Sequence, residues 1–245
     1  MTYVTFSFDT EDYVNPHAAD GILRSAMLLK QYEIKGCYNV VGWLAKALTE
    51  WGRQDIIDAL RHHDITPHSL SHSHHPTINE YTDLEDFEEA KRAFLKQETE
   101  CLQILSQYWS GKTISAACPP GNSTSYVAHY GYAELGIPFY DGDNLCDQNR
   151  GRPVTCCNIG CLDYTVCLEE VLRSHTKEQL VNLLDRLANE KDYAILYNHP
   201  QKLIIDEFWD GKNFNGKNTP KEQWILSPAM SEEQQVNQLF LGMAA

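Results

Sequence analysis

The sequence predicts an α/β protein, most simply a barrel of about seven strand–helix units. Strand-like and helix-like stretches alternate along the chain, and polar residues follow the ends of several predicted strands. No repeat, low-complexity tract or Pro/Gly-rich linker divides the 245 residues. A doubly wound sheet is the second architecture that this alternation allows. We expect a single domain over 1–245, with a core at about 3–200 and a C-terminal extension at 201–245.

In the first half of the chain, alternating apolar and polar residues over 4–8 predict a strand with two different faces. Ile22, Ala26 and Leu29 share one face of a predicted helix, which Gly36 ends. The elements expected next are a strand at 37–41, a helix at 53–62, a strand at 64–66 and a helix at 83–105.

The second half continues the alternation. The elements expected there are a strand at 114–117, a turn at 118–122, a helix ending at Leu135, and strands at 138–140, within 154–167 and at 194–197. Thr176 and Gln179 form a capping box that predicts a helix start, and Ser231 and Gln234 repeat the pattern near the C-terminus.

The composition limits the class of function. Hydrophobic residues make up 42% of the chain, charged residues 22%, and the formal net charge is -14. Nucleic-acid binding needs clustered basic side chains, so we expect no such partner. No apolar run is long enough for a membrane span, and the N-terminus resembles no signal peptide. We therefore expect a cytoplasmic protein without membrane contact, and no feature of the sequence predicts an oligomeric state.

Polar residues that can carry chemistry cluster after the predicted strands. In strand order they are Asp9, Glu11 and Asp12, then His68 and His72, then Asp141 and Asp143, and finally His199. In a parallel barrel the C-terminal ends of the strands meet on one face, where reactive residues gather. We therefore expect these side chains to converge.

His68 and His72 are separated by four positions. On a helical turn such a pair can direct two imidazoles to one metal ion, and a carboxylate from 9–12 would complete a set of three ligands. The alternative is a solvated histidine-rich loop, because His74 and His75 follow directly. His199 is either a buried packing residue or, beside a metal, a general acid.

Six segments lie in the order in which a known superfamily has its motifs. They are Phe8–Asp12 (FDTED), Gly36–Gly42 (GCYNVVG), His68–His72 (HSLSH), Cys118–Gly121 (CPPG), Tyr140–Asp143 (YDGD) and Tyr197–His199 (YNH). From Thr5 to about His199 the chain thereby resembles the polysaccharide deacetylase superfamily (carbohydrate esterase family four, the NodB-homology domain).

The resemblance implies a distorted NodB-like (β/α)7 barrel and a metal-dependent hydrolase. Such an enzyme would remove an acetyl or other small acyl group from the nitrogen of an N-acylated sugar or polysaccharide. Asp9 would be the base, and His199 the acid. The metal ligands would be His68 and His72 with one carboxylate, for which Glu11 and Asp12 compete. Glu11 is favoured because it has the strand parity of Asp9.

Zinc is the metal we expect for two histidines and a carboxylate, and nickel, cobalt or iron would also fit. The expected substrate contacts are Pro120, Gly121, Tyr126, Asp143, Leu196, Tyr197 and Trp209. Of these, Leu196, Tyr197 and Pro120 would wall the acyl pocket, and a backbone N–H near Tyr126 or Gly121 would bind the oxyanion. Trp209 lies in the aromatic- and amide-rich stretch 208–218, which is either a sugar-contacting lid or a packed surface loop.

Two departures from the family pattern concern the base. The usual pair of adjacent aspartates is stretched over Asp9–Asp12, and Cys118 stands where an arginine is expected. Arg150 or Arg152 could supply the missing positive charge. The departures keep two rival functions open: hydrolysis of a small cytoplasmic amide or formamide, and carbohydrate binding by a catalytically inactive relative.

Overall fold

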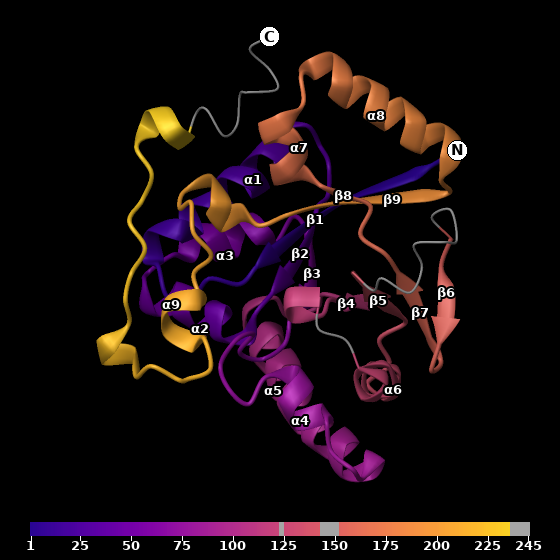
Figure 1. Ribbon diagram of the computed structural model, residues 1–245, viewed down its shortest axis with the longest axis vertical. Helices are drawn as coiled ribbons and strands as arrows, with labels where there is room; N and C mark the ends of the chain where they lie inside the picture. The colour runs from indigo at the N-terminus through magenta and orange to yellow at the C-terminus, as the bar shows by residue number, and fades with distance from the viewer. Residues whose placement is uncertain (123–124, 143–151, 236–245) are drawn as a thin grey trace.

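The computed structural model describes residues 1–122, 125–142 and 152–235 (Figure 1). The strands are β1 (Tyr3–Thr10), β2 (Cys37–Val40), β3 (Asp64–Pro67), β4 (Ala116–Ala117), β5 (Phe139–Asp141), β6 (Val154–Cys156), β7 (Ile159–Leu162), β8 (Val166–Cys167) and β9 (Tyr193–Asn198). The α-helices are α1 (Asp20–Gln31), α2 (Gly42–Glu50), α3 (Gln54–Leu60), α4 (Ile78–Thr82), α5 (Phe87–Tyr108), α6 (Tyr126–Glu134), α7 (Leu168–Ser174), α8 (Lys177–Glu190) and α9 (Gly211–Phe214). Short 3-10 turns lie at Pro16–Ala19, Pro120–Asn122, Pro200–Leu203 and Lys221–Gln223.

The strands form two sheets, and nearly every pairing is parallel. The first has the order β3-β2-β1-β9-β8 and the second the order β4-β5-β7-β6, in which only β6 runs antiparallel to its neighbour. A backbone hydrogen bond from Cys118 N to Pro67 O, 3.1 Å long, joins the two sheets just beyond β3 and β4. The predicted α/β class is confirmed, and the strands follow the expected order along the chain.

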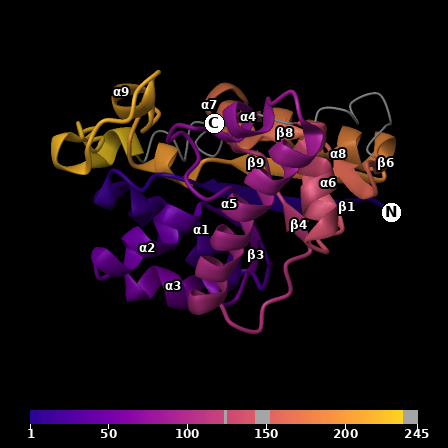
Figure 2. The ribbon, with the colours of Figure 1, turned by 90° about the horizontal axis from the view of Figure 1, so that it is seen from below.

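Helices bury the outer faces of both sheets, because the apolar residues of each strand and helix face one another. Side chains from β1 to β3 pack with α1, α2, α3 and α5, and Phe8 stacks on Tyr38 with ring centroids 4.7 Å apart. A second cluster joins β5 and β7 to α5 and α6, and a third joins β9 to α8. Figure 2 shows α1, α2 and α3 grouped on one side of α5 and α6 on the other.

The segment after β9 is part of the packed structure. Ile204, Ile205, Trp209 and Phe214 are buried in the same cluster as α1 and α2. In Figure 1 this segment, in orange and yellow, passes beside α2. The extension expected at 201–245 therefore completes the main core over its described part, and Trp209 is almost fully buried.

The structure agrees with the predicted capping boxes and differs from the predicted helical turn at HSLSH. Both capping boxes are present, with Gln179 N bonded to Thr176 and Gln234 N bonded to Ser231. The HSLSH stretch, however, is a loop and not a helical turn. Ser69 and His72 have positive φ values of 62° and 54°, which a right-handed helix excludes. Across the described ranges, no helix has the length and hydrophobicity that a membrane span requires.

Candidate active site

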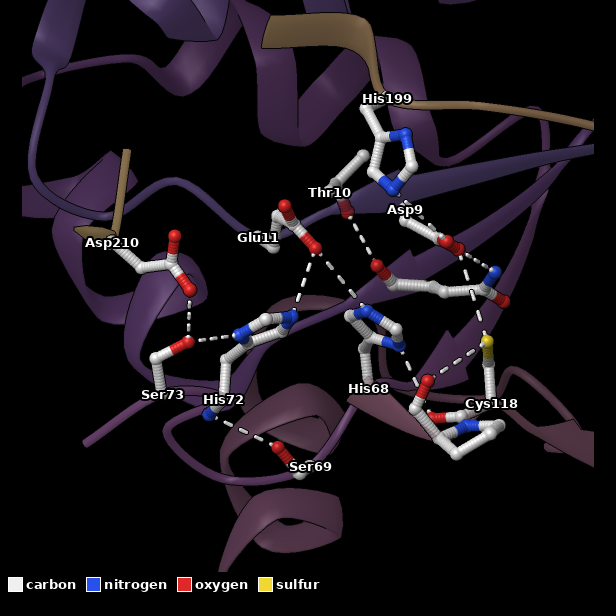
Figure 3. Close-up of polar contacts among 12 residues, drawn as sticks. Asp9, Thr10, Glu11, His68, Ser69, His72, Ser73, Cys118, His199 and Asp210 are labelled. Atoms are coloured by element: carbon white, nitrogen blue, oxygen red, sulfur yellow. Dashed lines mark hydrogen bonds and ion pairs between the residues drawn. The ribbon is translucent and has the colours of Figure 1, made fainter. Parts of the chain in front are cut away.

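Three parallel strands deliver the reactive residues to one edge of the first sheet. β1 lies between β2 and β9, and β3 is the next strand beyond β2, so Asp9 and Glu11 at the C-terminal end of β1 share one edge of the sheet with the ends of β3 and β9. His68 directly follows β3, and His199 directly follows β9. Figure 3 shows these side chains pointing toward one another. The convergence predicted from strand ends thus occurs in the structure.

Glu11, His68 and His72 form a buried group of three potential metal ligands whose atoms all lie within 4.8 Å of one another. Oε2 of Glu11 lies 2.9 Å from Nε2 of His72 and 3.5 Å from Nε2 of His68. Within the described part of the chain, neither Nε2 atom has a hydrogen bond of acceptable geometry. Two buried, converging nitrogen atoms beside a carboxylate form a donor set that can hold a divalent transition-metal ion.

In both His68 and His72 the Nδ1 atom is hydrogen-bonded on the side away from Glu11, and Nε2 faces Glu11. Nδ1 of His68 faces the carbonyl oxygen of Cys118 at 3.1 Å, so it carries the proton and donates it. Nδ1 of His72 contacts Oγ of Ser73 at 2.6 Å, and Ser73 in turn donates to Oδ2 of Asp210 at 2.6 Å. With Nδ1 protonated in each ring, Nε2 is the atom that can offer a lone pair once its own proton is lost, and the residues fit a metal ion.

Glu11 is held from behind by the C-terminal segment. Its Oε1 accepts hydrogen bonds from Nε2 of Gln201 at 2.8 Å and from Nε1 of Trp209 at 3.1 Å. Burial alone would raise the pKa of Glu11, but His72 and His68 hold this pKa well below its ordinary value. The carboxylate is therefore ionised, as a metal ligand must be.

Asp12 is not brought to the histidines. Its Oδ1 accepts bonds from the backbone N–H groups of Val14 and Asn15, both at 2.9 Å, and its Oδ2 accepts one from the Asn15 side chain. Burial raises the pKa of Asp12 to about 7. Of the two carboxylates that competed as third ligand, the geometry favours Glu11, and Asp12 caps the following loop.

Asp9 is held by neutral donors where an arginine was expected. Its Oδ1 accepts hydrogen bonds from Nδ2 of Asn39 at 2.6 Å and from the Tyr164 hydroxyl at 2.8 Å. Thr66 donates to the Asn39 oxygen, which fixes the amide with its nitrogen toward Asp9. The Cys118 thiol lies 3.8 Å from the same Oδ1. The Asp9 carboxylate, the candidate base, is therefore surrounded by Asn39, Tyr164 and Cys118.

Arg152 does not take the place of the missing arginine. Its side chain is 71% exposed and pairs with Asp192 at 2.8 Å. The hypothesis that it orients Asp9 is therefore wrong. Arg150, the other candidate, and Asp143, an expected substrate contact, lie outside the described residues. Asp141 is buried, and burial together with the nearby Asp9 raises its pKa to about 8, so it is mostly protonated at neutral pH.

His199 is paired on both ring nitrogens. Nδ1 lies 2.9 Å from Oε1 of Glu169, and Nε2 lies 3.7 Å from Oδ2 of Asp9. The backbone N–H of His199 also donates to Glu169 at 2.7 Å. Burial lowers the pKa of His199, but the hydrogen bond to Glu169 and the charges of Glu11 and Asp9 outweigh it and raise this pKa to about 10. His199 therefore carries a proton at neutral pH and can donate it.

A cavity of about 360 Å³, which we call the catalytic pocket, lies next to the candidate metal site and touches it through His72, while Asp9, Glu11, His68 and His199 are not among its lining residues. Pro120 and Gly121, two of the expected substrate contacts, line this cavity together with Asp210 and Phe214 from the C-terminal segment. Tyr126 is not among its lining residues, and the Tyr126 side chain is 65% exposed. Its expected contact with substrate has no support in this geometry.

Leu196 and Tyr197, both expected to wall the acyl pocket, are adjacent in β9, so their side chains point to opposite faces of the sheet. Tyr197 stacks on Tyr164, with centroids 4.2 Å apart and an interplanar angle of 11°. Leu196 points the opposite way, into the apolar cluster under α8, so its assignment to the acyl pocket is wrong. Trp209 was expected to stack on sugar. It is buried against Glu11 and His72 instead, where it supports the ligands and has no surface for a substrate.

Solved structures of other proteins superpose on this chain. The chain has the fold of the polysaccharide deacetylase superfamily. A protein from Mycobacterium smegmatis assigned as a polysaccharide deacetylase superposes with a TM-score of 0.57 at 16% identity, over 82% of this chain and 77% of the other. No protein-family model matches the sequence, and no curated protein matches it. The resemblance expected from the motifs is confirmed as a likeness of fold.

Two further structures show that this fold does not determine the chemistry. A 4-α-glucanotransferase from Thermococcus litoralis gives a TM-score of 0.60 at 12% identity, over 86% of this chain but 35% of the enzyme. A carbohydrate esterase family four pseudoenzyme from Bacillus anthracis gives 0.51 at 12%, over 82% of this chain and 56% of the other. This chain thus spans little more than a third of the first protein and just over half of the second. The fold alone therefore does not define the activity of this chain.

Proposed function

We propose that this protein is a metal-dependent hydrolase that removes an acetyl or other small acyl group from the nitrogen of an N-acylated sugar. The main support for this proposal is that Glu11, His68 and His72 converge beside the Asp9–His199 pair. An inactive relative would have no need to keep a base, an acid and three ligand atoms in one buried cluster. The polysaccharide deacetylase-type fold supports the same reading.

Glu11, His68 and His72 would hold the ion. Bound there, a divalent metal would polarise the acyl carbonyl and lower the pKa of water, and zinc is the first expectation for this donor set. The supporting hydrogen bonds from Gln201, Trp209 and Ser73 would keep the ligands in place.

The chain's own residues would move the protons. Asp9, held by Asn39 and Tyr164, would accept a proton from the attacking water through its carboxylate. His199, protonated on Nε2 and oriented by Glu169, would donate a proton to the leaving nitrogen. Of the two expected oxyanion donors, Gly121 lines the catalytic pocket and Tyr126 does not, so the backbone N–H of Gly121 is the one we propose.

The test combines metal analysis with an assay of acetate release. The metal-loaded protein is expected to release acetate from N-acetylglucosamine or its β-1,4 oligomers, and His72→Ala is expected to lose bound metal and activity together. Asp9→Asn should keep the metal and lose activity by at least about 100-fold. His62→Ala is the matched control, because His62 is exposed and remote from the ligands.

Each result separates the proposal from its rivals. Full activity in His72→Ala protein without metal would refute it. Metal binding without release of acetate or formate from any N-acylated sugar would favour the inactive carbohydrate-binding relative. Release from small amides alone would favour the small-molecule amidohydrolase.

A further inference from the structure

A second cavity lies between α2 and the C-terminal segment, on the other side of the His74–His75 stretch from the catalytic pocket. Its volume is about 530 Å³, within the range of roughly 300–1,000 Å³ that small-molecule sites occupy. We call it the aromatic hollow. His74 lines the hollow and His75 lines the catalytic pocket, so the two cavities share one wall. Asn218 clamps this wall through two hydrogen bonds with the His75 backbone, of 2.8 and 2.7 Å.

Aromatic rings line the inside of the hollow. The Tyr13 ring, buried to 3% exposure, lies 5.5 Å from the Trp43 ring and 5.8 Å from the Trp224 ring, centroid to centroid. Trp43 comes from α2 and Trp224 from the C-terminal segment, and both are only partly buried. The Trp43 ring also packs against the His74 ring at 4.7 Å, and Nζ of Lys221 lies 5.9 Å over the Trp224 ring. The remaining aromatic surface that borders the cavity is what a ligand ring can stack on.

Charged side chains surround this aromatic surface in balanced pairs. Lys46 lies 3.7 Å from Glu100, and Lys221 pairs with Glu50. All four side chains are about half exposed and line the hollow. Two cations and two carboxylates leave no net charge, so the rim has no net attraction for a ligand of either sign. An uncharged ligand with many hydroxyl groups can instead hydrogen-bond to both kinds of partner.

We infer that the aromatic hollow binds an uncharged sugar ring, as a subsite for a sugar unit of the same oligosaccharide whose N-acyl group enters the catalytic pocket. The stacking surface, the neutral hydrogen-bonding rim and the shared wall all point to this ligand. This inference rests on the proposed function, which is the reason for taking an N-acylated sugar oligomer as the ligand. The inferred subsite is separate from the reaction centre, because none of the residues proposed to hold the metal or move protons line the hollow.

The experiment has a kinetic arm and a binding arm. In the metal-loaded enzyme, Trp43→Ala and Trp224→Ala are expected to lower kcat/KM for the β-1,4 tetramer of N-acetylglucosamine by about tenfold each. They should leave kcat/KM for the monosaccharide unchanged, because it reaches only the catalytic pocket. In the full-length Asp9→Asn protein, where catalysis is blocked, the same substitutions should weaken tetramer binding measured by calorimetry by about the same factor.

The control is Trp51→Ala, which removes a partly buried tryptophan just after α2 that does not line the hollow. Trp224→Phe retains a ring and should keep binding within about twofold of wild type. If an alanine variant fails to fold, the double variant Lys46→Met/Glu100→Gln on the rim decides in its place, by weaker tetramer binding. Unchanged tetramer binding in the folded Trp43→Ala and Trp224→Ala proteins would overturn the inference. The binding arm stands even if no acetate is released, so the two proposals can fail separately.

Discussion

The hydroxyl of Tyr164 donates a 2.8 Å hydrogen bond to Oδ1 of Asp9, across 155 positions of sequence. Tyr164 stacks on Tyr197 of β9, so its ring is fixed by the sheet that also carries Asp9. A neutral hydroxyl thus orients the candidate base at a site where the sequence pattern suggested a missing cation. An ionised acceptor strengthens such a bond, which makes the contact important for the position of the carboxylate.

Tyr164→Phe should lower kcat by roughly 10- to 100-fold, because a hydrogen bond to a charged group contributes about 1.5–3 kcal/mol. Acetate release under saturating substrate measures the effect. Tyr197→Phe removes the hydroxyl of the stacked partner, which bonds toward Cys167, and should change little. A Tyr164→Phe enzyme with the wild-type kcat would show that Asn39 alone suffices.

The pairing of Glu169 with His199 predicts a shift in the pH dependence. The acid must be protonated, so activity falls as the pH rises through its pKa. Glu169 raises that pKa, and Glu169→Gln should move the alkaline limb of the kcat profile to lower pH. Glu170→Gln alters the exposed neighbouring carboxylate and should leave the profile in place. An unshifted alkaline limb in Glu169→Gln would mean that a different group limits the rate at high pH.

The connection from His72 through Ser73 to Asp210 predicts an effect on metal affinity. Ser73→Ala and Asp210→Asn should each weaken the binding of zinc by roughly 10- to 100-fold, since partners behind a ligand hold its ring and tautomer. Competition with a chelator of known affinity measures this directly, without an assay of activity. Ser106→Ala, on the exposed face of α5, is the control. Equal affinities in Ser73→Ala and Ser106→Ala would contradict the assignment.

Glu98 predicts a pH-dependent stability. Its side chain is fully buried in α5, where it accepts a 2.8 Å hydrogen bond from Tyr132, and burial raises its pKa to about 7. A raised pKa in the folded state means that stability is present below about pH 4.5 and is lost as the pH rises through 7. Relative to wild type, Glu98→Gln should therefore gain stability on going from pH 5 to pH 8.

The gain should approach about 3 kcal/mol in the free energy of unfolding, the equivalent of the shift in pKa. Urea denaturation of both proteins at the two pH values gives the comparison. Glu100→Gln, on the exposed side of the same helix, should show no such pH dependence. A difference between Glu98→Gln and wild type that is equal at both pH values would show that the buried carboxyl does not ionise.

Much of the site follows from one rule about parallel strands. Because β1, β3 and β9 run parallel in one sheet, their C-terminal ends lie along the same edge. The positions of Asp9 near the end of β1 and of His68 and His199 just past β3 and β9 therefore predict that these side chains lie close together. The parity of β1 also favoured Glu11 over Asp12. The same parity, applied to β9, would have separated Tyr197 from Leu196 and avoided the wrong assignment of Leu196.

The remaining site residues depend on contacts that local patterns do not encode. Glu169 lies beside His199 because the two-residue strand β8 pairs with β9, with Cys167 opposite Tyr197. A strand of that length has no recognisable periodicity. Tyr164, Gln201 and Asp210 reach the site from loops and turns, where tertiary packing alone sets the direction of a side chain.

The contribution of the C-terminal segment to the metal ligands has a consequence for biogenesis. The two histidines and Glu11 emerge from the ribosome well before Gln201, Trp209 and Asp210, which hold them in position. A nascent chain could thus form its first three strands while its ligand set is still loosely held. Tight and selective capture of an ion would begin only after the segment following β9 has been translated and has docked beside α2. In the proposed enzyme, the complete metal site would therefore form late, after most of the polypeptide has been synthesised.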